Sequence, residues 1–300
     1  MSTRVTTGML SQRVLADLHR VNERMVRSQT QISSGKAIQR PSDDPFGTSR
    51  AMVLRENLDG VEQFQRNVED ARGWQDAAES AMTRMSDAVQ RTRELVIQGG
   101  NGSADQSARD AIAQEIDELA ESLKEFANAS YKDQYIFGGV RTDAPPYGQT
   151  PAGDVSQAQP GPVARQIGPG VSVAINVDLG AVLGNGAGDD RLLHVLRDIA
   201  THLRTGDGAA LRTTDLERLD AGFATLLDAR ALNGARSNRL DAALGRLAEL
   251  EEASIAQLSA TEDVDIAEAL IGFSSQQAAY QAALKAGANI VQSSLMDFLR

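Results

Sequence analysis

The chain contains no cysteine among its 300 residues. Disulfide bonds, thiolate metal sites and cysteine-based catalysis are therefore excluded. Histidine occurs only three times, and His194, Asp198 and His202 are spaced by four residues on an expected helix. Residues four apart on a helix lie about 6 Å from each other, so the two histidines are too far apart to share one ion. We expect these three residues to form a solvated helix face, and we expect no metal and no cofactor.

Aromatic residues make up only 4% of the sequence, although 41% of its residues are hydrophobic. Aromatic side chains supply much of the buried area in compact cores. Here Ala, Leu, Ile, Val and Met must supply the packing instead, which is typical of helical bundles. Trp74 is the single tryptophan, and we interpret it as a packing anchor on a long helix.

Long apolar runs are also absent. No stretch approaches the roughly 18 apolar residues of a membrane span, and residues 1–10 lack the apolar run of a secretory signal. The net charge of −11 disfavours nucleic acid and anionic membranes as partners. We expect neither partner, and any export must use a route that does not read a cleavable signal peptide.

Proline occurs only in two regions, 41–45 and 145–169. Because proline breaks helix interiors, the stretches between these regions can form long helices. Apolar residues at spacings of three and four predict helices over 5–35, 47–98, 105–130, from Asp190 through Leu203, over 215–258, and after a polar break at Ser259–Asp265.

The middle of the chain, between residues 138 and 188, is instead rich in glycine and proline. Apolar residues alternate with Ser, Ala and Asn over 171–177, which predicts a strand. Residues 163–167 are its expected partner. The run Gly184–Asp190 superficially resembles a phosphate-binding or calcium-binding loop, but it lacks the residues of both motifs. We interpret this run as a flexible connector whose last residue, Asp190, caps the next helix.

Both ends of the chain carry a narrow apolar stripe. Steps of three and four place such residues on one side of a helix, as in a coiled coil. The two stripes therefore predict that the ends meet each other or meet other chains. We call these residues the assembly seams: Leu10, Val14, Leu18, Val21, Met25, Ile32, Ile266, Leu270, Phe273, Tyr280, Leu284, Val291 and Phe298.

The predicted fold is mainly α: an elongated, antiparallel bundle of long helices with terminal coiled-coil helices and a small β-containing insertion. Three domains are expected: a terminal assembly domain (1–40 plus 260–300), a helical rod (41–135 plus 190–259) and a β insertion (136–189). Paired carboxylates such as Glu251 and Glu252 stand on helices, and nothing places two of them across a cleft as hydrolysis requires. No feature of the sequence favours an enzyme.

Four motifs then point to a family. Residues 31–36 (QISSGK) with 41–47 (PSDDPFG) resemble the N-terminal segment of flagellin-like proteins. Residues 135–139 (YIFGG) resemble a signature of hook-associated junction proteins. Residues 233–240 (NGARSNRL) and the tail from Tyr280 to Leu299 resemble the family's return helix and C-terminus. Because the four occur in the family's order, the chain is identified as similar to hook-filament junction proteins of the FlgL type.

That resemblance implies a structural subunit of the bacterial flagellum, located outside the cell. It implies a ring of identical subunits between a neighbouring hook-associated junction protein and flagellin. It also implies export in an unfolded state through the flagellar type III apparatus, with a chaperone bound to the C-terminal region. Such a chaperone makes physical sense because uncovered apolar seams would stick to one another.

Two alternatives stay open at this point. The nearest is flagellin, the filament subunit, against which residues 135–139 argue. The other is a cytoplasmic helical adaptor that shares only the coiled-coil composition.

Overall fold

The computed structural model describes residues 7–101, 105–148, 154–184 and 188–298. The chain divides into two compact units, one formed by Met1–Gly60 with Leu250–Arg300 and the other by Val61–Glu249. The two units are described separately below. The prediction of a mainly α bundle with a small β insertion is confirmed, whereas the division into three domains stays a prediction.

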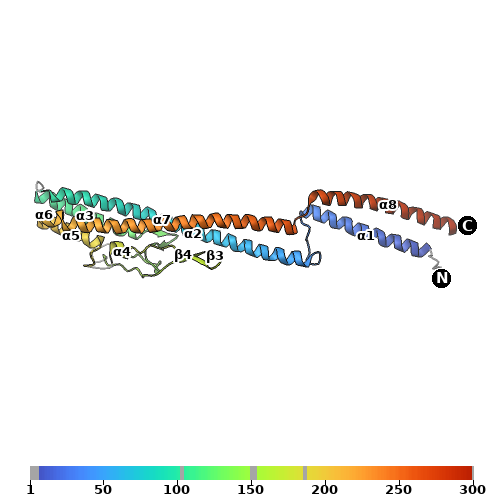
Figure 1. Cartoon of the computed structure of the whole chain (residues 1–300), viewed down its shortest axis with the longest axis horizontal. Coiled ribbons are helices and arrows are strands. Elements are labelled where there is room, and N and C mark those ends of the chain that lie inside the picture. The colour runs from blue at the N-terminus through green and yellow to red at the C-terminus, as the bar shows by residue number, and fades with distance from the viewer. Residues whose placement is uncertain (1–6, 102–104, 149–153, 185–187, 299–300) are drawn as a thin grey trace. The chain divides into compact units, whose positions relative to one another are not determined.

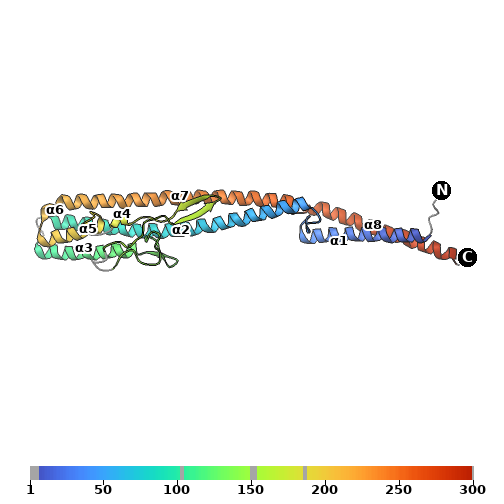
Figure 2. The same ribbon diagram turned by 90° about the horizontal axis from the view of Figure 1, so that it is seen from below.

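The first unit is built from the two ends of the chain. Helix α1 (Thr7–Ser34) packs along helix α8 (Ile266–Phe298), and the two lie side by side in both views (Figures 1 and 2). The start of α2 (Pro45–Gly100) and the end of α7 (Thr214–Glu262) complete this unit. Heptad spacing in α1 explains the pairing, because it places one apolar stripe toward a partner helix.

The second unit is held together by the antiparallel pairing of α2 with α7. Arg72 pairs with Asp241 at 3.2 Å, and further along α2, Arg93 pairs with Asp220 at 2.8 Å. The residue number falls on α7 as it rises on α2, so the helices run in opposite directions. Helices α3 (Gln106–Ala127) and α5 (Leu192–Thr205) pack on each other, and the short α6 (Gly208–Arg212) precedes α7.

The core of this unit is packed mostly by aliphatic residues, as the composition predicts. Trp74 is its largest side chain, only 1% exposed, and its ring meets Tyr131 edge-on at 6.5 Å between centroids. The predicted packing role of Trp74 is therefore confirmed. Glycine allows one close helix approach, because a Cβ at Gly99 would overlap the Leu203 side chain of α5. Helix α2 accordingly continues through Gly100 and does not break at Gly99.

Two small antiparallel hairpins lie in the middle of the chain, one inside the insertion and one just before it. Strands β3 (Ala164–Gly168) and β4 (Val171–Ala174) form the predicted pair. A second hairpin, β1 (Ser130–Tyr131) with β2 (Gln134–Tyr135), lies where the sequence predicts helix to residue 130. The short helix α4 (Gly180–Leu183) follows. The strand predicted to reach Val177 ends at Ala174, because the carbonyls of the next two residues accept hydrogen bonds from helical side chains, Gln75 and Arg236.

Two helix ends differ from the prediction. Asp190 does not cap α5; the cap position is Arg191. Asp190 adopts a left-handed φ of 56°, and its carboxylate pairs with Arg218. Helix α7 continues to Glu262 through the predicted break at Ser259, and the Asp263 N–H still donates to the Ser259 carbonyl at 2.9 Å.

Candidate assembly surface

The predicted seam residues of α1 lie where a pairing face requires them. Val14, Leu18, Val21, Met25 and Ile32 are all partly buried. Because α1 packs only along α8 among the described elements, these residues form the face that α1 presents to its partner. The side chain of Leu10 lies outside the described residues.

The pairing face of α8 is formed by smaller residues than predicted. Phe273 and Tyr280 are partly buried, and so are Ala269, Ala283 and Gly287. A Cβ on Gly287 would approach Val14 of α1 to 3.0 Å. Small residues therefore let the two backbones approach each other closely. Between them, the Ser28 hydroxyl donates a hydrogen bond to Gln276 Oε1 at 3.1 Å.

The remaining seam residues of α8 lie outside this pairing face. Ile266 is 54% exposed, Leu270 49% and Leu284 45%, so within one chain they do not take part in the α1–α8 contact, and their role in assembly stays a prediction. The side chains of Val291 and Phe298 lie outside the described residues. Sequence reasoning also missed Ile271, which is 70% exposed. The partly buried positions 269, 273, 276, 280, 283 and 287 follow spacings of three and four, and they mark the inner face of α8.

The terminal pair therefore has a second, outward apolar side. On α1 it includes Met9, Leu15 and Val26, all about half exposed. Isolated exposed apolar residues are ordinary on protein surfaces. Here they recur on both helices of one pair, which is the arrangement that further copies or other subunits can cover.

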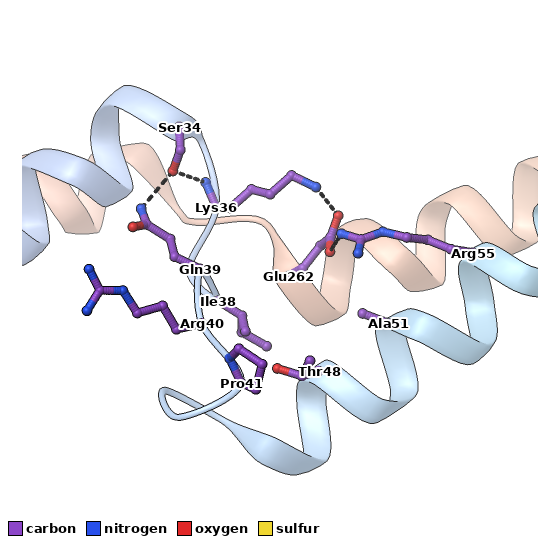
Figure 3. Close-up of a pocket in the computed structure, with 10 residues that line it drawn as sticks. All are labelled: Ser34, Lys36, Ile38, Gln39, Arg40, Pro41, Thr48, Ala51, Arg55 and Glu262. Atoms are coloured by element: carbon purple, nitrogen blue, oxygen red, sulfur yellow. Dashed lines mark hydrogen bonds and ion pairs between the residues drawn. The ribbon is translucent and has the colours of Figure 1, made fainter.

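A buried carboxylate fastens the terminal pair to the start of α2. Glu262 accepts from Lys36 and from Arg55, and its own side chain is only 6% exposed (Figure 3). Burial alone would raise the pKa of Glu262, but the hydrogen bonds from Arg55 and Lys36 outweigh burial and lower the pKa. Beside it, Ala37 N donates to Glu262 O at 2.7 Å and Val264 N donates to Gly35 O at 2.9 Å.

The proline-rich loop enters α2 through side-chain caps. Asp44 Oδ1 accepts from the backbone N–H groups of Phe46 and Gly47 at 3.1 and 3.0 Å. Pro45 occupies the first helical position, where its missing N–H costs nothing. Asp44 therefore caps the start of α2. A Cβ at Gly47 would lie 2.5 Å from the side-chain ends of both Asp44 and Ile38, so a larger residue there would displace the capping side chain.

A cavity of about 290 Å³ lies between this loop, Glu262 and α2. Figure 3 shows Thr48, Ala51 and Arg55 reaching into it from one side of α2, with Ile38 and Pro41 on the opposite wall. No sequence motif predicts this cavity, because its wall combines residues more than 200 positions apart.

The junction-type motif at 135–139 has a packing role in the second unit. Ile136 and Phe137 are buried, and Gly139 has a φ of 67°. A Cβ at Gly139 would overlap the carbonyl oxygen of Gln159, whose backbone pairs with this segment. The motif therefore lets the chain turn sharply while the insertion crosses close to it.

The histidine-containing face of α5 is not uniformly solvated. His194 lies 3.6 Å from Asp198, as neighbours on one helix do. His202 Nδ1 instead lies 2.7 Å from the fully buried carboxylate of Asp215, so the prediction of a solvated face is wrong for His202. Within the described part of the chain, no group of three or more His, Asp or Glu residues is arranged to hold a metal ion.

No helix among the described residues has the length and apolar character needed to cross a membrane.

The comparisons with known proteins agree with this architecture. The bacterial flagellin N-terminal helical region matches residues 5–142. Flagellar hook-associated protein 3 of Salmonella typhimurium strain LT2 is 25% identical over 99% of this chain and 100% of its own length. Flagellin of Bacillus subtilis strain 168 is 28% identical over the same shares.

Among solved structures, a putative flagellar hook-associated protein from Vibrio parahaemolyticus superposes with a TM-score of 0.68 at 21% identity, covering 73% of this chain and 99% of that one. This likeness shows the fold. The relatives are structural proteins of the flagellum and not enzymes, and the similarity indicates a flagellar location.

Proposed function

We propose that this chain is a flagellin-like protein of the hook-associated protein 3 type, and that it is the structural subunit joining the hook side of the bacterial flagellum to the flagellin filament. The observation that carries the proposal is the similarity to hook-associated protein 3 over the full length of both chains. The proposed role is structural and involves no catalysis and no cofactor.

The terminal pair supports this role physically. An assembly subunit needs apolar surface that its own fold leaves uncovered, and both α1 and α8 carry such residues outside their mutual contact. The partners would be further copies of the chain in a ring, a neighbouring hook-associated junction protein and flagellin. A chaperone covering the C-terminal region before export would keep Ile266, Leu270 and Ile271 from associating prematurely.

Export without a cleavable signal peptide is part of the same proposal. A chain that crosses a narrow channel must unfold first, and the absence of cysteine means that no disulfide opposes unfolding. The protein would then reach its place outside the cell at the distal end of the hook.

Flagellin is the second candidate, because it matches with similar identity and coverage. The motif at 135–139 favours the junction role over the filament role. Concentrated purified protein separates the two candidates: a filament subunit forms long polymers visible by electron microscopy, and the proposed junction subunit does not.

Deletion of the gene, followed by electron microscopy and analysis of the medium, tests the proposal. We expect complete hooks without filaments, with flagellin released into the medium, and we expect a plasmid copy of the gene to restore filaments. A deletion strain with normal filaments would overturn the proposal.

A further inference from the structure

Phe46 is the most exposed large apolar side chain described in the chain. It is 89% exposed, although its backbone N–H is fixed by the Asp44 cap at the start of α2. One heptad later, Val53 is 54% exposed and lies only about 20° away around the helix, since a helix turns about 100° per residue. The two side chains form a rigid apolar knob, which we call the Phe46 knob. Buried aromatic anchors contribute most to the affinity of protein interfaces.

The 290 Å³ cavity lies on the opposite side of the same helix. Thr48, Ala51 and Arg55 line it, and they are displaced by roughly 140–200° from Phe46 around the helix axis. Figure 3 shows these three side chains on the side of α2 that faces Glu262. A cavity of about 150 Å³ can already hold a benzene ring, so this one is large enough for a phenylalanine side chain.

The charges on the two sides are complementary. The ten residues that line the cavity include three bases, Lys36, Arg40 and Arg55, against the single acid Glu262. Around the knob, the segment 41–49 contains the two acids Asp43 and Asp44 and no base, and Arg50 follows one turn later. Acidic residues beside the knob and basic residues around the cavity attract each other, which favours association and fixes the orientation of the two copies.

A knob and a cavity on opposite sides of one helix cannot meet within the same chain. They can meet between identical chains in a head-to-tail arrangement, which closes into a ring when the rotation between neighbours allows it. Resting on the junction function proposed above, we infer that the Phe46 knob of one copy inserts into the cavity between Ile38, Ala51 and Arg55 of the next copy.

Disulfide trapping in assembled flagella tests this contact, because the chain has no cysteine of its own. Two differently tagged variants, Phe46→Cys and Thr48→Cys, are produced together in the host that lacks the native gene. Flagella are sheared from the cells and treated with a mild oxidant. The matched control replaces Phe46→Cys by Met52→Cys, because Met52 is also well exposed on α2, at 62%, but lies on a different side of the helix.

We expect a disulfide-linked dimer carrying both tags with Phe46→Cys and Thr48→Cys, and at least ten-fold less of it with the Met52→Cys control. A dimer of Phe46→Cys with itself would indicate a two-fold arrangement and would overturn the head-to-tail contact. If both variants are present in the flagella but the mixed dimer does not form, the head-to-tail contact is overturned as well. Absence of the unsubstituted protein from sheared flagella would instead overturn the junction function.

Discussion

The contact between Glu262 and its two cations offers a quantitative test of how the terminal unit is held together. Replacing Glu262 by Gln keeps the size of the side chain but removes its charge and replaces one of its two accepting oxygens by an NH2 donor. Lys36 and Arg55 stay 41% and 50% exposed, so water can solvate them after the change. We therefore expect the variant to lose one charge-assisted hydrogen bond, which lowers the free energy of opening this contact by about 1.5–3 kcal/mol.

The local effect of this change is measurable by hydrogen exchange. The N–H groups of Ala37 and Val264 bond across the same contact, so they exchange when this part of the unit opens. Since about 1.4 kcal/mol corresponds to a factor of ten, Glu262→Gln should accelerate their exchange roughly 10- to 100-fold. Amides in the middle of α5, which belongs to the other unit, should not change.

The control variants sharpen this prediction. Glu252→Gln on the exposed side of α7 removes the same charge without a comparable contact, and its effect should stay below two-fold. The double variant Lys36→Ala, Arg55→Ala leaves the buried carboxylate unpaired. It should lower the free energy of opening by more than Glu262→Gln does, by about 3–5 kcal/mol. The reasoning is refuted if Glu262→Gln exchanges like the wild type, or if the double variant opens less than Glu262→Gln does.

Three further predictions concern pH and packing. The pKa of Glu262 is lowered in the folded state, so its contribution to stability is complete above the unfolded pKa of about 4.3 and disappears as the pH falls through the folded pKa. The difference in amide exchange rate between wild type and Glu262→Gln should therefore vanish in acid, and a difference that stays constant with pH would contradict this. Gly139→Ala should destabilise the second unit by more than about 2 kcal/mol in a denaturant titration, because its methyl group meets the Gln159 carbonyl at a strained φ; a change below about 0.5 kcal/mol would contradict the crossing described here. Trp74→Ala should cost about 3–5 kcal/mol in the same assay, whereas Trp74→Phe should cost clearly less, because the indole N–H is buried without a partner among the described residues; equal losses would refute that account.

The helical part of the fold could be predicted from the sequence because its signals are local. Proline at 41–45 and the apolar periodicity after it place the start of α2 near residue 47, close to the observed Pro45. The predictions differ from the structure at helix ends because the groups there have more than one possible hydrogen-bond or ion-pair partner. Asp190 pairs with Arg218 and does not cap α5, and α7 continues past Ser259, whose carbonyl accepts from the Asp263 N–H.

The face of α8 shows what a sequence pattern leaves open. The sequence offers two overlapping stripes, one of large apolar residues and one of small residues. Apolar size favours the first, with Ile266 and Leu270, whereas close packing against α1 selects the second, with Ala283 and Gly287. Which stripe faces inward depends on the distance between the two helices, and periodicity does not contain that distance.

The Glu262 contact and the cavity beside it were beyond sequence reasoning for another reason. Lys36 and Glu262 are separated by 226 positions, and the motif that contains Lys36 gives no indication of its partner. Their meeting follows from how α1 and α8 pair, because that pairing brings the loop after Gly35 beside the end of α7. Only the tertiary structure provides this information.

The location of the protein on an intact flagellum tests the central claim most directly. A small epitope tag in the insertion, between β3 and β4, can be labelled with gold on isolated flagella and located by electron microscopy. A junction subunit predicts gold at a single position, between the hook and the start of the filament. Gold distributed along the filament would identify a flagellin, and flagella without gold from cells that produce the tagged protein would contradict a structural role there.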